Sequence, residues 1–193
     1  MEDAPGEASL ESYDDSQWKD VVLPHDFIIE RDYTGKNGLG PFLRDIKDSI
    51  STGNLPGGTG WYRKHFTLSK NNSGLDRLFL EFDGVYMNST VYVNGREVGF
   101  RPYGYSSFEY DITPYVHEGQ NVVAVRVDNS DQPNSRWYSG CGIYRHVWLT
   151  KTHPIHVKHW GVYVQYSPPE IGGARGGLNK RKLTVSVQIE NAV

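Results

Sequence analysis

The sequence predicts an all-β protein, and three observations lead to that prediction. Aromatic residues make up 13% of the 193 residues, and the chain also has 21 Gly and 10 Pro. Short runs of Val, Tyr, Ile and Phe alternate with clusters of Gly, Asn, Asp and Pro, which is typical of strands joined by turns. No long stretch repeats apolar residues at helical spacing. The length fits one domain, or one domain and part of a second.

The predicted strands follow one another at short intervals. Residues 61–68 (WYRKHFTL) alternate apolar and polar side chains. Residues 121–127 (NVVAVRV) place three valines on one face and turn Val122 outward. Asn94-Gly95 between two β runs indicates a type I′ hairpin, because both turn residues need positive φ angles. The other expected strands are 21–24 (stopped by its proline), 78–82, 87–93, 96–100, 106–112, 146–149, 155–166 and 183–189.

The chain is predicted to divide near residues 151–154. Strands at this spacing in residues 1–150 indicate a β-sandwich or jelly roll. The two strands that follow, in residues 151–193, cannot bury a core of their own. They either pack on the sandwich or begin a second domain. Residues 31–60 have no clear period, and a loop of that length is usually functional or mobile.

Charge and composition exclude several classes of partner. The net charge is -3, with 20 basic and 23 acidic residues and no long block of either sign, so nucleic acid is not expected as a partner. No stretch is apolar and long enough to suggest a membrane span. The single cysteine, Cys141, cannot form an internal disulfide. Met1-Glu2-Asp3 is the opposite of a basic signal-peptide start. A periplasmic or secreted location is favoured if a leader has been removed, and a cytoplasmic one otherwise.

Residues 128–145 (DNSDQPNSRWYSGCGIYR) are the most informative segment for function. Asn and Asp exchange hydrogen bonds with vicinal hydroxyls, Arg offers a rigid fork of donors, and Trp and Tyr present flat faces to a sugar ring. The same residue types also suit a structured turn, with Asp and Asn as caps and Trp in the core. Both interpretations stay open on composition alone. The candidate substrate-binding residues here are Asp128, Asn129, Asn134, Arg136 and Trp137.

No catalytic carboxylate pair or metal site is predicted in this chain. A retaining glycosidase needs two carboxyl groups roughly 5 Å apart, whereas the glutamates are scattered over predicted strands and no two share a loop. Glu81 and Glu109 are expected at solvent-facing strand positions. The histidines at 153, 156 and 159 have a spacing that points successive side chains to opposite faces of a strand, so one metal cannot collect all three. No cofactor is expected in this chain.

Four segments, in this order, resemble the N-terminal part of family 2 glycoside hydrolases. They are residues 23–27 (LPHDF), 58–64 (GTGWYRK), 82–95 (FDGV continuing into VYVNG) and 136–149 (RWYSGCGIYRHVWL). The resemblance implies a jelly-roll sugar-binding sandwich of the galactose-binding type in a β-galactosidase-like enzyme. It also implies an immunoglobulin-like domain next, of which residues 151–193 would be the first strands. A barrel with two catalytic glutamates would follow, so the chain alone is expected to be inactive.

The same resemblance implies that the loops of the sandwich complete the pocket for a terminal β-linked sugar. His25 and Asp26 lie at a loop entry that could reach this pocket, or they form a hydrogen-bonded turn. The expected partners are the sugar and the downstream domains, and homo-oligomerisation is left open. The family usually begins with a further strand, whose absence would expose a sheet edge. A stand-alone carbohydrate-binding module and an assembly interface remain as alternatives, and galactoside is not separated from glucuronide or mannoside.

Overall fold

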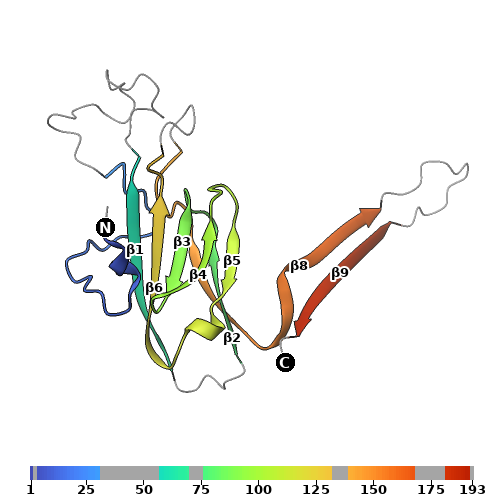
Figure 1. Cartoon of the computed structure of the whole chain (residues 1–193). Coiled ribbons are helices and arrows are strands. Elements are labelled where there is room, and N and C mark those ends of the chain that lie inside the picture. The colour runs from blue at the N-terminus through green and yellow to red at the C-terminus, as the bar shows by residue number, and fades with distance from the viewer. Residues whose placement is uncertain (2–3, 31–56, 70–75, 132–138, 168–180, 192–193) are drawn as a thin grey trace, which may run out of the picture.

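The computed structural model describes residues 1, 4–30, 57–69, 76–131, 139–167 and 181–191. Figure 1 shows a β-sandwich and a separate two-stranded hairpin, which confirms the all-β class. The helical elements of the described residues are η1 (Gly6–Ser9) and η2 (Thr113–Tyr115). They have four and three residues, far too few to traverse a lipid bilayer.

Two antiparallel sheets form the sandwich. The first has the order β1-β6-β3-β4, made of β1 (Thr59–Leu68), β6 (Gly119–Asp128), β3 (Ser89–Val93) and β4 (Arg96–Arg101). The second has the order β5-β2-β7, made of β5 (Phe108–Asp111), β2 (Arg77–Phe82) and β7 (Val147–Thr152). The chain therefore crosses repeatedly between the sheets, as the jelly-roll prediction requires.

The core lies between the inner faces of the two sheets. Alternate residues of each strand point inward because the side-chain period of a strand is two. Phe82 is fully buried and its ring stacks on Phe108 with the centroids 4.9 Å apart. Other buried members of this cluster are Leu78, Leu80, Val91, Val93, Val123, Val125 and Val127. The sandwich thus supplies its own hydrophobic core.

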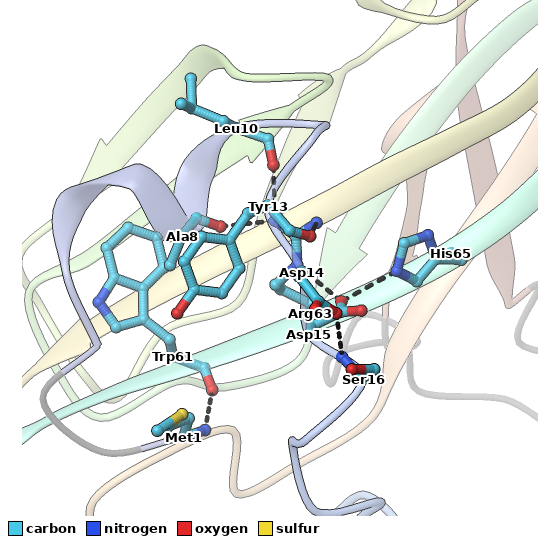
Figure 2. A network of polar contacts seen from close by, with 10 residues as sticks. All are labelled: Met1, Ala8, Leu10, Tyr13, Asp14, Asp15, Ser16, Trp61, Arg63 and His65. Carbon is cyan, nitrogen blue, oxygen red and sulfur yellow. Dashed lines mark hydrogen bonds and ion pairs between the residues drawn. The ribbon is translucent and has the colours of Figure 1, made fainter.

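The N-terminal segment covers the outer face of the first sheet. Ala8 packs into a second buried cluster with Trp61 and Ala124. The Arg63 side chain is 1% exposed and reaches back into this segment. Its guanidinium donates to Ala8 O at 2.6 Å, to Leu10 O at 2.9 Å and to Asp15 Oδ2 at 2.7 Å (Figure 2). Arg63 of β1 therefore holds the N-terminal segment, about 50 positions earlier in the chain, against the first sheet.

Local patterns gave most of the strands correctly. All nine strands of the described residues overlap ranges predicted from periodicity. Asn94 and Gly95 have φ angles of 50° and 78°, as a type I′ turn requires.

Val122 lies on the face of β6 opposite Val123, Val125 and Val127, as predicted, but it is 4% exposed because that outer face is covered as well. One local expectation was wrong. Residues 21–24 form no strand, and Val22 is 87% exposed. Pro24 has no N–H to extend a ladder, and backbone pairing begins only with His25 N to Ile143 O at 2.8 Å.

Strands β8 (Ile155–Ser167) and β9 (Lys182–Asn191) pair only with each other in the described part of the chain. Their directly paired residues share a face, which carries Val162, Val164, Tyr166, Leu183, Val185 and Val187. These six side chains are between 48% and 64% exposed. The base of the hairpin contacts the second sheet, where the His156 and Phe79 rings lie 5.4 Å apart. Whether residues 151–193 begin a separate domain stays a prediction.

Candidate functional site

Asp128 lies where β6 ends, opposite Thr59 at the start of β1 (Figure 1). Its Oδ1 accepts from the Ser130 backbone N–H at 3.0 Å and from Ser130 Oγ at 2.6 Å, and its Oδ2 accepts from Arg126 Nη2 at 2.8 Å. Burial alone would raise the pKa of this carboxyl, but the Ser130 and Arg126 hydrogen bonds outweigh it and lower the pKa. Asp128 is therefore a fixed, ionised acceptor that remains 24% exposed.

Asn129 is 4% exposed and ties the ends of the candidate loop together. Its backbone exchanges two hydrogen bonds with Gly58, at 2.9 and 3.1 Å. Its Nδ2 donates to Cys141 Sγ at 2.9 Å and to Gly140 O at 3.3 Å. These contacts position the loop, and direct contact of Asn129 with a sugar stays a prediction. Asn134, Arg136 and Trp137 lie outside the described residues, so their predicted sugar contacts are also untested.

Gly142 joins segments that are far apart in the sequence. Its backbone exchanges two 2.9 Å hydrogen bonds with Tyr86. A Cβ at this position would lie 2.3 Å from the Tyr62 hydroxyl oxygen and 2.7 Å from His25 O, and the φ angle is +140°. Only glycine allows this approach without displacement. The LPHDF and GCGIY segments are thus packed directly against each other.

His25 belongs to a row of hydrogen-bonded polar side chains next to this junction. Its Nδ1 lies 2.8 Å from the Tyr62 hydroxyl and its Nε2 lies 3.2 Å from Glu30 Oε2, which also accepts from Lys19 Nζ at 2.6 Å. Burial raises the pKa of Tyr62. Hydrogen bonds from Lys19 and then His25 lower the pKa of Glu30. This row of hydrogen-bonded side chains borders a groove of about 480 Å³ between the N-terminal segment and β1.

The structure does not place all the predicted residues in one cavity. Asp128 is absent from the lining of the groove that His25 borders. The Asp26 carboxylate accepts from the Ile28 and Ile29 backbone N–H groups at 3.0 and 3.4 Å, as in a hydrogen-bonded turn. The roles of His25 and Asp26 toward a sugar therefore stay predictions.

Two exposed tyrosines near Asp128 were not among the predicted residues. Tyr103 and Tyr105 are 59% and 51% exposed, with their ring centroids 5.8 Å apart. Tyr105 also contacts Tyr86 at 5.2 Å, and the next residue, Met87, accepts a hydrogen bond from Asp128 N at 3.0 Å. Tyrosine presents a flat apolar face together with a polar group. A Tyr-Gly-Tyr run between two predicted strands was the signal that could have revealed them.

The expectation of scattered, solvated glutamates was wrong for one pair. Glu81 of β2 and Glu109 of β5 are direct cross-strand partners, and their side chains are only 19% and 21% exposed. His159 lies between them, 3.4 Å from an oxygen of each. Burial raises the pKa of Glu109, His159 opposes this, and Glu81 adds to it. Because the imidazole occupies the space between the carboxylates, they do not form an open catalytic pair.

Comparisons with known proteins agree with this architecture. Residues 11–153 match the model of the family "Glycosyl hydrolases family 2, sugar binding domain". The chain is 53% identical to the β-galactosidase BoGH2A of Bacteroides ovatus over 163 residues, covering 83% of this chain and 18% of that protein. It is 42% identical to a putative β-glucuronidase of Formosa agariphila, covering 86% of this chain and 15% of that protein.

The solved structures give the same result. A β-glycosidase from Bacteroides vulgatus superposes with a TM-score of 0.81 at 39% identity, covering 99% of this chain and 23% of that one. A family 2 β-glucuronidase superposes with a TM-score of 0.76 at 27% identity. The chain spans less than a quarter of the length of these relatives. It belongs to the sugar-binding domain family of the family 2 glycosyl hydrolases.

Proposed function

We propose that this chain is the non-catalytic sugar-binding domain of a retaining exo-β-glycosidase that hydrolyses terminal β-galactosides. The galactoside assignment rests on one observation, the 53% identity to a β-galactosidase over 83% of the chain. The putative β-glucuronidase is less similar, at 42%. In this proposal the catalytic carboxylates belong to a barrel elsewhere in the full protein, and the sandwich completes its pocket.

The rim around Asp128 is suited to this accessory role. Its carboxylate is held in place by Ser130 and Arg126, so it can accept a sugar hydroxyl without reorganising. Tyr103 and Tyr105 offer exposed aromatic faces on the neighbouring loop. A neutral hydrogen bond contributes about 0.5–1.5 kcal/mol, and one to a charged group about 1.5–3 kcal/mol. We therefore expect the isolated chain to bind free galactose with a Kd of about 1 mM or weaker.

The hairpin supports the proposal that further domains follow. Its six paired apolar side chains are at least 48% exposed in the described structure. A two-stranded sheet is marginal in water unless a face is covered. We propose that the continuation of an immunoglobulin-like domain covers this face in the full protein.

The test uses the protein expressed from its complete gene beside the 193-residue chain. We expect the full protein to hydrolyse p-nitrophenyl β-galactoside with a higher kcat/KM than the β-glucuronide, and the chain to hydrolyse neither. Asp128→Asn in the full protein should lower kcat/KM about tenfold, which corresponds to about 1.4 kcal/mol. Glu97→Gln, at an exposed position of β4, is the matched control and should leave kcat/KM unchanged.

Three results would contradict parts of the proposal. A higher kcat/KM for the β-glucuronide would remove the galactoside assignment. Unchanged kinetics in Asp128→Asn would give the rim a purely architectural role. Micromolar galactose binding by the isolated chain, measured by calorimetry, would favour a stand-alone carbohydrate-binding module.

A further inference from the structure

We propose that Glu81, Glu109 and His159 bind one divalent transition-metal ion, of the Zn²⁺ class, where the hairpin meets the sandwich. The three side chains come from β2, β5 and β8. This site is separate from the rim around Asp128 and does not rest on the proposed function.

The distances fit a small coordination sphere. One ligand atom from each residue can be chosen so that all three lie within 4.8 Å of one another. His159 Nε2 lies 3.4 Å from Glu81 Oε1. Zinc bonds of about 2.0–2.2 Å to nitrogen and oxygen, arranged tetrahedrally, place neighbouring ligand atoms about 3.3–3.6 Å apart. The Glu81–His159 separation is therefore already that of a tetrahedral edge. Glu109 Oε2 lies 3.4 Å from Nδ1, the other ring nitrogen, so the proposal requires the Glu109 side chain to rotate toward Nε2 when the ion binds.

The polar surroundings favour a cation at this position. Two carboxylates that face each other directly across neighbouring strands repel. Partial burial reduces the screening of that repulsion by solvent. His159 Nε2 is buried and makes no hydrogen bond among the described residues. The neighbouring His156 Nε2 lies 3.8 Å from Glu190 Oε2 within the same hairpin.

The donor set selects the class of metal. One imidazole nitrogen and two carboxylates suit zinc and related first-row ions, whereas Mg²⁺ and Ca²⁺ prefer oxygen ligands throughout. Three protein ligands leave a position for water. This departs from the sequence-based expectation that the chain holds no metal. That expectation considered three histidines of one strand, but the other two ligands here come from strands that only the sheet order makes neighbours.

A metal at this site would fix the base of the hairpin to the sandwich. His159 lies within the register shift of β8, beside Trp160, whose φ angle is +52°. The two rings are in contact, with centroids 4.3 Å apart. An ion held by β2, β5 and β8 would therefore immobilise the irregular part of β8 from which the rest of the hairpin extends.

The experiment titrates the untagged 193-residue chain, stripped with a chelator, with Co²⁺ and then with Zn²⁺. We expect one Co²⁺ per chain, detected by visible absorption bands of the bound ion, and its displacement by Zn²⁺. His159→Asn and Glu81→Gln should each weaken Zn²⁺ binding at least tenfold in calorimetry. His156→Asn removes a histidine three positions away on the same strand and should change the affinity less than twofold.

The wild-type titration decides the proposal even if a variant fails to fold, which circular dichroism will show. Absence of saturable Co²⁺ binding would overturn it and leave the His159 imidazole alone as the group between the carboxylates. Binding that persists unchanged in folded His159→Asn, or that His156→Asn weakens equally, would also overturn it, because the ion would then lie elsewhere.

Discussion

The sheet β1-β6-β3-β4 and the hairpin β8-β9 have similar alternating sequences but different surroundings. Val125 in β6 is 3% exposed and Ala124, on the opposite face, is 1% exposed. Val185 and Val187 in β9 are 53% and 48% exposed. The first sheet is covered by the second sheet on one side and by the N-terminal segment on the other. Alternation therefore predicts a strand, whereas burial depends on which other element covers each face.

The largest difference between the two regions should appear in core truncations. Phe82 is fully buried, with 0% of its surface accessible, and it stacks on Phe108. Phe82→Ala should lower the free energy of unfolding by about 3–5 kcal/mol because it opens a cavity. Val185→Ala in the hairpin should change it by less than about 0.5 kcal/mol. Urea denaturation followed by circular dichroism measures both, and equal losses would show that the hairpin face is covered in solution.

A smaller effect should follow from loosening the N-terminal cover. Arg63→Met removes the donors to Ala8 O, Leu10 O and Asp15 but keeps the aliphatic packing. We expect a loss of about 1–3 kcal/mol, as for hydrogen-bonding groups left without partners. Hydrogen exchange should accelerate in residues 8–15 and not in β2. Arg77→Met, which breaks a more exposed pair with Asp111, is the control. Unchanged exchange in residues 8–15 would mean that apolar contacts alone hold the segment.

The smallest expected effect is a pH dependence of the same cover. Burial alone would raise the pKa of Asp15, but hydrogen bonds from Arg63 and His65 outweigh it and hold the pKa below its usual value. The resulting stabilisation is present above the unfolded pKa of about 3.9 and is lost as the pH falls through the lower folded value. Asp15→Asn should therefore reduce stability at pH 7 but show a shallower loss below about pH 4 than the wild type. Parallel pH profiles for the two proteins would exclude this contribution.

Features that depend on neighbouring residues were predictable from the sequence. The strands and the Asn94-Gly95 turn follow from side-chain alternation and from the φ angles that a tight turn needs. Features that depend on strand order were not. Glu81 and Glu109 are 28 positions apart and meet only because β5 pairs with β2. Val122 is buried because the outer face of β6 is covered, which its own pattern cannot reveal.

The candidate site was predictable in composition but less so in geometry. Asp128 was expected at the end of a strand, and it lies there with its carboxylate partly exposed. Asn129, the next residue, points into the protein because successive residues leaving a strand face opposite ways. The Tyr103 and Tyr105 rings join this region through Tyr86, a contact between two separate connecting segments that no local pattern encodes.

The buried thiol of Cys141 can report how often this end of the sandwich opens locally. It is the single cysteine of the sequence, 2% exposed, and its sulfur accepts a hydrogen bond from Asn129. A disulfide reagent reacts with a thiolate that it can reach, so modification requires this end of the sandwich to open first. The labelling rate then measures how often the Asn129–Cys141 contact breaks. A sugar bound at the adjoining rim would lower that labelling rate, so binding could be followed without attaching a chromophore to the protein.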